Sequence, residues 1–199
     1  ILFKARFSKE DALYHTRNDE VYVWHMAMRG RTLYTLGTDN WQCCYMSVGL
    51  ANTGKSTELN IYRRFFDPTE VATLSKTTEK TFGFENLEKK RLWIAPDIPE
   101  NLSETLDQSL FCSIVTGEPV NIAGKNKMAN QVSKPLDLHL IMCGNRPPDY
   151  TNDQEIRRIA MLPWNRAVPD KDSTLEKYIL KTEMPNLLLK FVLAYRWAK

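Results

Sequence analysis

Apolar runs of strand length recur along the chain from residue 43 onward, separated by longer polar stretches. A short continuous apolar run bounded by turn residues is typical of a buried strand. We therefore expect core strands within residues 43–48, 92–97, 137–145 and 159–164.

Helical spacing follows the first of these runs. Leu59, Tyr62, Arg63 and Phe66 recur three or four residues apart, and Asp67-Pro68 ends the pattern. A second helix is expected over residues 101–117, with Ser103 as its N-cap. Near the end of the chain, apolar residues share one helical face and predict a core-facing helix. They are Leu187, Leu188, Phe191, Val192 and Tyr195.

The secondary structure of two other segments is not predicted by their sequence pattern. Residues 21–28 are compatible with a helix or a strand, because periodicity does not distinguish the two in a short apolar run. Residues 69–87 are polar and interrupted. The histidines at positions 15, 25 and 139 have no metal-ligand spacing and are assigned no role.

Composition sets broad limits. The chain has 199 residues, 43% of them hydrophobic, which suits one compact domain, and a net charge of +3, too small to indicate nucleic-acid binding by itself. The apolar stretch 187–195 is too short to cross a bilayer, so no membrane partner is expected. The first residue is Ile, which leads us to expect a piece of a longer protein.

A phosphate-binding loop is the strongest motif in the chain. The strand within 43–48 leads into G-x-x-x-x-G-K-S, and a helical stretch follows, as this loop requires. The glycines allow backbone angles that turn N–H groups toward phosphates, Lys55 is expected to reach the β- and γ-phosphates, and Ser56 to ligate Mg²⁺. The expected nucleotide-binding residues are Gly49, Leu50, Ala51, Asn52, Thr53, Gly54, Lys55, Ser56 and Thr57.

Polar residues end the next two apolar runs. Asp97 follows the second run and is expected to hold the Mg²⁺ water shell or to polarise the attacking water, with Glu100 as the reserve candidate. The sequence leaves open which acid activates water. Asn145 ends the third run, where its amide can bond the γ-phosphate or the water.

Residues 119–134 form a basic segment without an acid. Val120 and Ile122 alternate with polar residues before a turn-like stretch, which predicts a β-hairpin with Lys125, Asn126 and Lys127 at its tip. Such a tip can follow a phosphodiester backbone without reading bases. A solvated loop is the competing interpretation, and charge alone favours it.

Two arginines precede the fourth run. Arg157 and Arg158 are candidates for an arginine finger, acting within their own subunit or across a subunit interface. Arg158 is preferred because it directly adjoins the strand. The alternative is a pair of surface arginines of little energetic consequence.

Other nucleotide enzymes and a non-enzyme compete with an ATP-driven motor. A GTPase or small-molecule kinase shares the phosphate loop, but the guanine-reading N-K-x-D would need Asp at 129, where the chain has Ala. A ring-forming DNA clamp or packaging element that binds ATP is the second alternative.

The order of these motifs resembles that of the superfamily 3 helicases, most closely the helicase domain of primase–helicase proteins of poxviruses and giant viruses. The resemblance covers about residues 30–199. Its further marks are Asp-Asn-Trp-Gln at 39–42, Ala-Pro-Asp-Ile at 95–98, Thr-Gly-Glu at 116–118 and Gly-Asn-Arg-Pro-Pro at 144–148. Many members have paired acids where this chain has Ala95-Pro96-Asp97.

The resemblance implies an α/β fold of the AAA+ type, a phosphate-loop NTPase with a central parallel sheet flanked by helices and a basic β-hairpin. It implies a motor core at 43–168, an N-terminal appendage at 1–42 and a C-terminal helical segment at 169–199. It further implies ATP and Mg²⁺ as cofactors, a homo-oligomeric ring, commonly a hexamer, and single-stranded DNA or a replication fork as partner. The expected location is inside a virus-infected host cell. The family's primase domain is absent from this chain and belongs, if present, to a longer parent chain.

Overall fold

The computed structural model describes residues 14–74, 87–98, 101–120 and 134–199. The chain divides into two compact units. The first, here called the sheet unit, comprises residues 35–48 and 66–162; the second, the terminal unit, comprises residues 1–34, 49–65 and 163–199. The domain boundaries expected at residues 42 and 168 stay a prediction.

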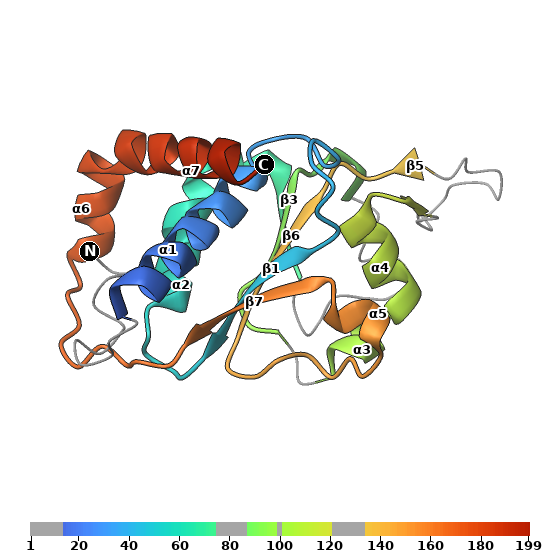
Figure 1. Cartoon of the computed structure of the whole chain (residues 1–199), viewed down its shortest axis with the longest axis horizontal. Helices are drawn as coiled ribbons and strands as arrows, with labels where there is room; N and C mark the ends of the chain where they lie inside the picture. Colours follow the sequence, from blue (N-terminus) through green and yellow to red (C-terminus); the bar gives the residue numbers. More distant parts are fainter. Residues whose placement is uncertain (1–13, 75–86, 99–100, 121–133) are drawn as a thin grey trace. The chain divides into compact units, whose positions relative to one another are not determined.

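A five-stranded sheet forms the framework of the sheet unit (Figure 1). Its order is β2-β3-β6-β1-β7. The strands are β1 (Cys44–Gly49), β2 (Val71–Thr73), β3 (Leu92–Ala95), β6 (His139–Gly144) and β7 (Ile159–Trp164), of which the last residues of β1 and β7 belong to the terminal unit. The pairs β2–β3, β3–β6 and β6–β1 are parallel. The expected α/β fold with a central parallel sheet is confirmed.

The strand register fixes which residues share an edge of the sheet. Val48 is paired with Gly144, and Ala95 with Met142, so the carboxyl ends of β1, β6 and β3 lie at one edge. The amide of Cys44 donates to the carbonyl of Arg158 over 2.8 Å, so β7 begins beside the amino end of β1, at the opposite edge.

Short helices complete the sheet unit: α3 (Leu102–Thr105), α4 (Gln108–Thr116), α5 (Asp153–Ile156) and the 3₁₀ helices η3 (Pro68–Glu70) and η4 (Leu87–Lys89). The amphipathic α4 contacts both α5 and β6. Its inward residues Phe111 and Ile114 are buried with Met46, Trp93 and Met142 of the sheet in one hydrophobic core. Burial of such large apolar side chains is the dominant stabilising contribution.

The region 101–117 is two helices rather than the single helix predicted. Leu106 has an extended backbone, and Asp107 follows it as the N-cap of α4, accepting a hydrogen bond from the amide of Leu110. An Asp at this position satisfies an amide that has no partner inside the helix. The N-cap predicted at Ser103 is therefore wrong, because Ser103 lies inside α3.

The two-stranded sheet of β4 (Pro119–Val120) and β5 (Lys134–Pro135) is antiparallel. Val120 is paired with Lys134. These strands bracket the basic segment, so the base of the expected hairpin is present. Its predicted tip, Lys125, Asn126 and Lys127, lies outside the described residues.

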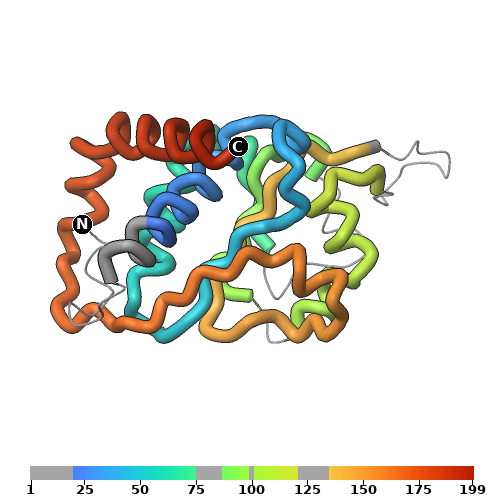
Figure 2. The backbone as a smooth tube through the Cα atoms, in the orientation of Figure 1, coloured from blue at the N-terminus to red at the C-terminus, as the bar shows by residue number. Residues whose placement is uncertain are grey.

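The terminal unit consists of helices: α1 (Tyr14–Arg31), α2 (Lys55–Tyr62), the 3₁₀ helix η2 (Arg63–Phe65), α6 (Leu175–Thr182) and α7 (Met184–Ala198). Helices α1 and α7 contact each other, and the tube in Figure 2 shows α1 running obliquely to α7. The predicted apolar face of the last helix is confirmed at Phe191 and Tyr195, which are buried. The ring of Phe191 packs edge-on against the ring of Tyr62, with centroids 5.6 Å apart. Among the described residues, no helix combines the length and hydrophobicity that a membrane span requires.

Candidate nucleotide-binding site

The phosphate loop has the left-handed backbone that its glycines allow. The φ angles are 141° at Gly49, 59° at Asn52 and 88° at Gly54. A Cβ atom at Gly49 would lie 2.3 Å from the carbonyl oxygen of Trp164, so no larger residue fits without moving the backbone. Hydrogen bonds from Leu50 N to Trp164 O (3.1 Å) and from Val168 N to Asn52 O (3.0 Å) hold the loop against the chain after β7.

Helix α2 begins directly after this loop without a side-chain cap. Gly54 is the N-cap residue and has no side chain with which to bond the first amides of the helix. Uncapped amides at a helix N-terminus carry partial positive charge and bind anions such as phosphate. Ser56, in the first turn, is exposed.

The ammonium group of Lys55 lies within the loop itself. Its Nζ donates to the carbonyl oxygens of Gly49 (2.8 Å) and Leu50 (2.5 Å) and to Thr53 Oγ1 (3.3 Å), and the residue is only 8% exposed. A buried ammonium requires such partners, because leaving it unpaired costs several kcal/mol. The positive charge is thus held among the residues expected to surround the phosphates.

Asp97 and Asn145 follow neighbouring strands of the sheet unit. Asp97 comes after β3 and Asn145 directly after β6, and both are exposed. The amide of Ile98 donates to the carbonyl of Cys143 over 2.9 Å. A Cβ atom at Gly144 would lie 2.5 Å from Ile98 Cγ1, so Gly144 is required for this close approach. The structure therefore brings the segments that carry Asp97 and Asn145 together at the carboxyl edge of the sheet.

Asp149 ties the loop after Asn145 to helix α3. Its carboxylate accepts hydrogen bonds from the amide of Ser103 (2.9 Å) and from the Ser103 hydroxyl. Partial burial raises the pKa of Asp149, but these hydrogen bonds outweigh that effect and hold the pKa below its usual value. The next residue, Tyr150, donates its hydroxyl to the carbonyl of Leu106 over 2.6 Å. The loop is thereby fixed at two successive residues.

Replacing Asp149 with alanine is expected to lower the melting temperature at pH 7 by about 2–4 °C, because a lost helix-capping carboxylate costs about 1 kcal/mol in a chain of this size. A carboxylate whose pKa is lowered by folding stabilises the folded state at pH values above its ordinary pKa. This stabilisation is lost as the pH falls through the lowered pKa. The difference in melting temperature between the two proteins is therefore expected to shrink as pH falls below about 4. A difference that stays constant from pH 7 to pH 3 in thermal melts would contradict this assignment.

The two candidate arginines lie at the other edge of the sheet. Arg158 directly precedes β7, and its carbonyl accepts the hydrogen bond from Cys44 at the amino end of β1. The four residue steps from Cys44 to Val48 span about 13 Å, at about 3.3 Å a residue. That is longer than an arginine side chain. Within the sheet unit, the arginines are therefore separated from Asp97 and Asn145.

The two arginines also differ from each other. Arg158 Nη1 donates to the carbonyl of Gln154 over 2.6 Å, and the Arg158 side chain is partly buried. Arg157 is exposed. The sequence favoured Arg158 as the finger, but its bond within the same chain favours Arg157 as the arginine able to reach another molecule.

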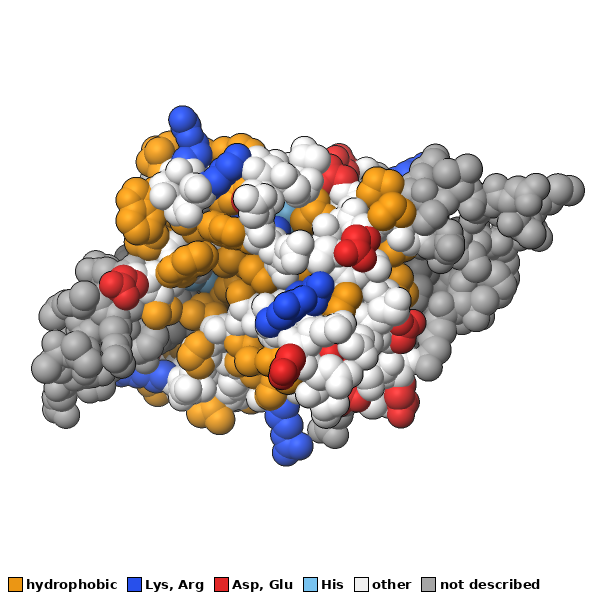
Figure 3. All heavy atoms as spheres, turned by 45° about the vertical axis from the view of Figure 1, so that its right-hand side comes forward, with side chains coloured by type: hydrophobic (Ala, Val, Ile, Leu, Met, Phe, Trp, Pro, Cys, Tyr) orange, Lys and Arg blue, Asp and Glu red, His pale blue; other side chains and the backbone are white. Residues whose placement is uncertain are grey.

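Four expected site residues lie outside the described part of the chain: Glu100 and the hairpin residues Lys125, Asn126 and Lys127. Charged side chains of both signs are scattered over the face drawn in Figure 3, and those of Lys and Arg form no continuous patch among the residues described there. The basic sequence of residues 119–134 is what indicates a nucleic-acid contact.

The residues present fit a magnesium nucleotide. In the terminal unit, the loop with left-handed Gly49 and Gly54 leads into helix amides without a side-chain cap and to the exposed Ser56. In the sheet unit, the exposed Asp97 carboxylate offers oxygen, the ligand type that Mg²⁺ prefers.

An ionic cluster between helices α1 and α2 was not predicted from the sequence. Glu58, in the first turn after Lys55 and Ser56, contacts Arg29 and His25 of α1. The partners are far apart in the sequence, so no local spacing relates them. The sequence shows His25 within the apolar stretch 21–28 and Arg29 directly after it, with no indication of their partner.

Comparison with solved structures supports the fold at low sequence identity. An apo structure described as the A form of the NrS-1 C-terminal region matches with a TM-score of 0.63 and 15% identity, over 92% of this chain and 42% of that chain. A structure of JCV helicase with a bound phenoxyphenyl acetamide compound matches with a TM-score of 0.51 and 12% identity, over 100% of this chain and 53% of that chain. The chain thus spans about half or less of the length of either protein. The resemblance to helicases expected from the motif order is confirmed at the level of the fold.

Sequence comparison gives a family. No curated protein matches the chain. The model of a family described as a family of unknown function, DUF5906, matches residues 47–158, which include the phosphate loop, Asp97, Asn145 and both candidate arginines. Because the match covers more than half of the 199 residues, the chain belongs to the DUF5906 family.

Proposed function

We propose that the chain is the motor of an ATP-dependent DNA helicase of viral DNA replication. It hydrolyses ATP at the subunit interfaces of a homo-oligomeric ring, with a hexamer as the expected form, and moves along single-stranded DNA. The observation that carries the proposal is the phosphate loop, in which the left-handed Gly49 and Gly54 lead into an uncapped helix. The fold shared with JCV helicase supports the choice of a helicase over other users of this loop.

Each candidate residue has a chemical role in this proposal. When bound, ATP supplies the phosphoryl group to be transferred to water, and Mg²⁺ offsets the charge on its phosphates. The amides of the loop and of the first turn of α2 would bind phosphate oxygens, and the Lys55 ammonium, which now bonds two loop carbonyls, would also bind them. Ser56 and Asp97 would hold the metal, Asn145 would sense the γ-phosphate, and Asp97 or Glu100 would orient the attacking water.

An arginine from a neighbouring subunit completes this proposed site. The separation of the arginine pair from the carboxyl edge of the sheet argues against a finger acting within its own chain. A head-to-tail ring would bring the amino edge of one subunit to the nucleotide of the next. Arg157 is the favoured finger, with Arg158 as the alternative.

The hairpin is proposed to convert hydrolysis into movement along DNA. Replacing Lys125 with alanine is expected to leave basal ATP hydrolysis unchanged and to abolish unwinding, because the ammonium that is removed touches the DNA backbone and not the nucleotide. The dependence of DNA affinity on salt is expected to weaken, by about 0.7 in the slope of log K against log salt for each phosphate that the variant no longer neutralises.

The measurement is strand displacement of a forked duplex beside ATP hydrolysis on the same sample. The matched control is Lys89→Ala, which removes an exposed lysine from η4, within the charge run that precedes β3. Unwinding by Lys125→Ala equal to that of the control would remove the hairpin assignment while leaving the nucleotide site untouched.

A further inference from the structure

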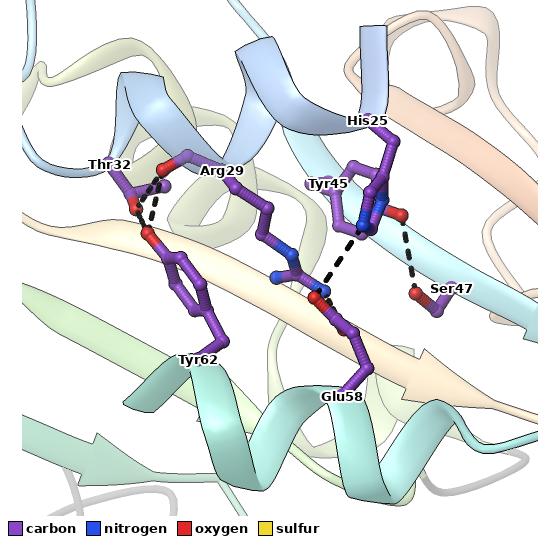
Figure 4. Close-up of polar contacts among 7 residues, drawn as sticks. All are labelled: His25, Arg29, Thr32, Tyr45, Ser47, Glu58 and Tyr62. Carbon is purple, nitrogen blue, oxygen red and sulfur yellow. Dashed lines mark hydrogen bonds and ion pairs between the residues drawn. The ribbon is translucent and has the colours of Figure 1, made fainter. Parts of the chain in front are cut away.

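The first turn of helix α2 is held by a partly buried ionic contact, here called the α1–α2 clamp and made by Arg29, His25 and Glu58 (Figure 4). Arg29 is 0% exposed and donates its Nη2 to Glu58 Oε2. His25, also buried, places its Nε2 3.7 Å from the other carboxylate oxygen, Glu58 Oε1. Both oxygens of one carboxylate are thus engaged by side chains of α1.

Burial of a guanidinium costs free energy, which its carboxylate partner must offset. Removing a charged group from water costs several kcal/mol unless good geometry and hydrogen bonds compensate it. Since apolar side chains of similar volume often serve stability equally well, a buried ion pair is weak evidence for a purely stabilising role. A charge-assisted pair between a guanidinium and a carboxylate also restricts the orientation of the carboxylate.

Glu58 is placed where orientation affects the phosphate loop. It lies three residues after Lys55 and two after Ser56, in the same helical turn, and its amide donates to the carbonyl of Gly54, the N-cap residue. Since Gly54 supplies no side-chain cap, the start of α2 is fixed by its surroundings. An unpaired Glu58 carboxylate would also place a negative charge beside a site for polyphosphate, and Arg29 neutralises it.

A second contact between the same helices provides an internal comparison. Tyr62, in the last turn of α2, donates its hydroxyl to the Arg29 carbonyl over 2.7 Å and also contacts the Thr32 hydroxyl. Its ring packs under the Arg29 guanidinium, 4.7 Å from ring centroid to Cζ. This contact attaches the end of α2 that is distant from the phosphate loop, so it serves the packing of the two helices.

We infer that Glu58 is a positioning residue for nucleotide binding and that Arg29 and His25 hold it in place. The inference rests on the proposed function, because it assigns the clamp to the same phosphate loop. Helix α1 thereby becomes part of the nucleotide-binding machinery, although it carries no residue of the phosphate-loop motif. The clamp aligns the first turn of α2, with its amides, Lys55 and Ser56, toward the phosphates.

The test measures binding of Mg–ATP by calorimetry and the melting temperature of each variant. Glu58→Gln, nearly the same shape without the charge, is expected to weaken ATP binding about tenfold or more, since small misalignments of a site have effects of this size. Arg29→Met is expected to do the same, and Arg29→Lys, which keeps the charge, to recover part of the loss. Tyr62→Phe is expected to lower the melting temperature and leave the ATP dissociation constant unchanged.

The outcomes separate the two proposals. If the unmodified chain binds ATP and Glu58→Gln binds it equally well, the clamp has no positioning role and the proposed function stands. If Tyr62→Phe weakens binding as much as Glu58→Gln, the effect is general loosening of α2, and the inference is also overturned. If the unmodified chain binds no nucleotide, the proposed function fails and this inference fails with it.

Discussion

Replacing Lys55 with alanine is expected to lower ATP turnover by about 100-fold or more, the usual cost of removing a charged group that stabilises the transition state. The ammonium is already inside the loop, where Gly49 and Leu50 carbonyls and Thr53 bind it. It needs only to exchange these oxygens for those of the nucleotide. Steady-state hydrolysis of Mg–ATP measures the effect directly.

The same variant needs a check on folding, because Lys55 also bonds three oxygens of its own loop. A thermal melt of Lys55→Ala is therefore required beside the kinetics. Lys177→Ala serves as the control, since Lys177 is an exposed lysine of helix α6 outside the loop. Turnover by Lys55→Ala within twofold of the control, in a folded protein, would contradict the role given to Lys55.

The second large effect concerns the arginine pair. Arg157→Ala alone is expected to lower turnover by about 10³-fold or more, as for other arginine fingers, and Asp97→Asn alone to abolish it. An equal mixture of the two variants is expected to recover about a quarter of the normal rate. In such a ring, about one interface in four joins an intact Asp97 to an intact Arg157 of the neighbouring subunit.

This mixing experiment also decides between the arginines. Arg158→Ala is expected to keep most of its turnover, because Arg158 is bound to Gln154 of its own chain. Mixing it with Asp97→Asn is therefore expected to bring no recovery of rate. The reverse result, with recovery only in the Arg158→Ala mixture, would make Arg158 the finger. Absence of recovery in both mixtures would show that no active site is shared between subunits.

The strands of the fold were predictable because most of them are buried. Residues of β3 and β6 are buried throughout, so their sequences are continuous apolar runs that stand out from the polar residues around them. Strand β2 was missed for the opposite reason. Its three residues, Val71 to Thr73, are partly or fully exposed at the sheet edge, and a run this short gives no periodic signal.

The helix boundaries were not predictable from the spacing of apolar residues alone. The apolar residues from Leu106 to Ile114 keep helical spacing across the break between α3 and α4. The break is instead made by Asp107, which caps the new helix. Asp, Ser and Asn are common both at caps and in loops, so the choice between Ser103 and Asp107 required the backbone itself.

Some parts of the candidate site were predictable from contiguous residues, and others depend on residues that are distant in the sequence. The phosphate loop is a contiguous motif, and its left-handed residues at 49 and 54 are the glycines that the motif requires. The position of Arg157 at the edge opposite Asp97 follows from strand order and register, which no local pattern contains. The clamp of Arg29 and Glu58 likewise joins residues of separate helices, and a charge within α1 gives no indication of its partner.

We propose, above all, that this chain converts ATP hydrolysis into movement along DNA. The most direct measurement is its rate of Mg–ATP hydrolysis with and without single-stranded DNA, on a sample whose mass is determined in the same experiment. We predict Mg²⁺-dependent turnover by a ring-sized assembly and a clear rise in rate when the DNA is added. Nucleotide binding by such an assembly without turnover, or turnover that DNA leaves unchanged, would contradict this proposal and favour an ATP-binding clamp in the first case and a different ATPase in the second.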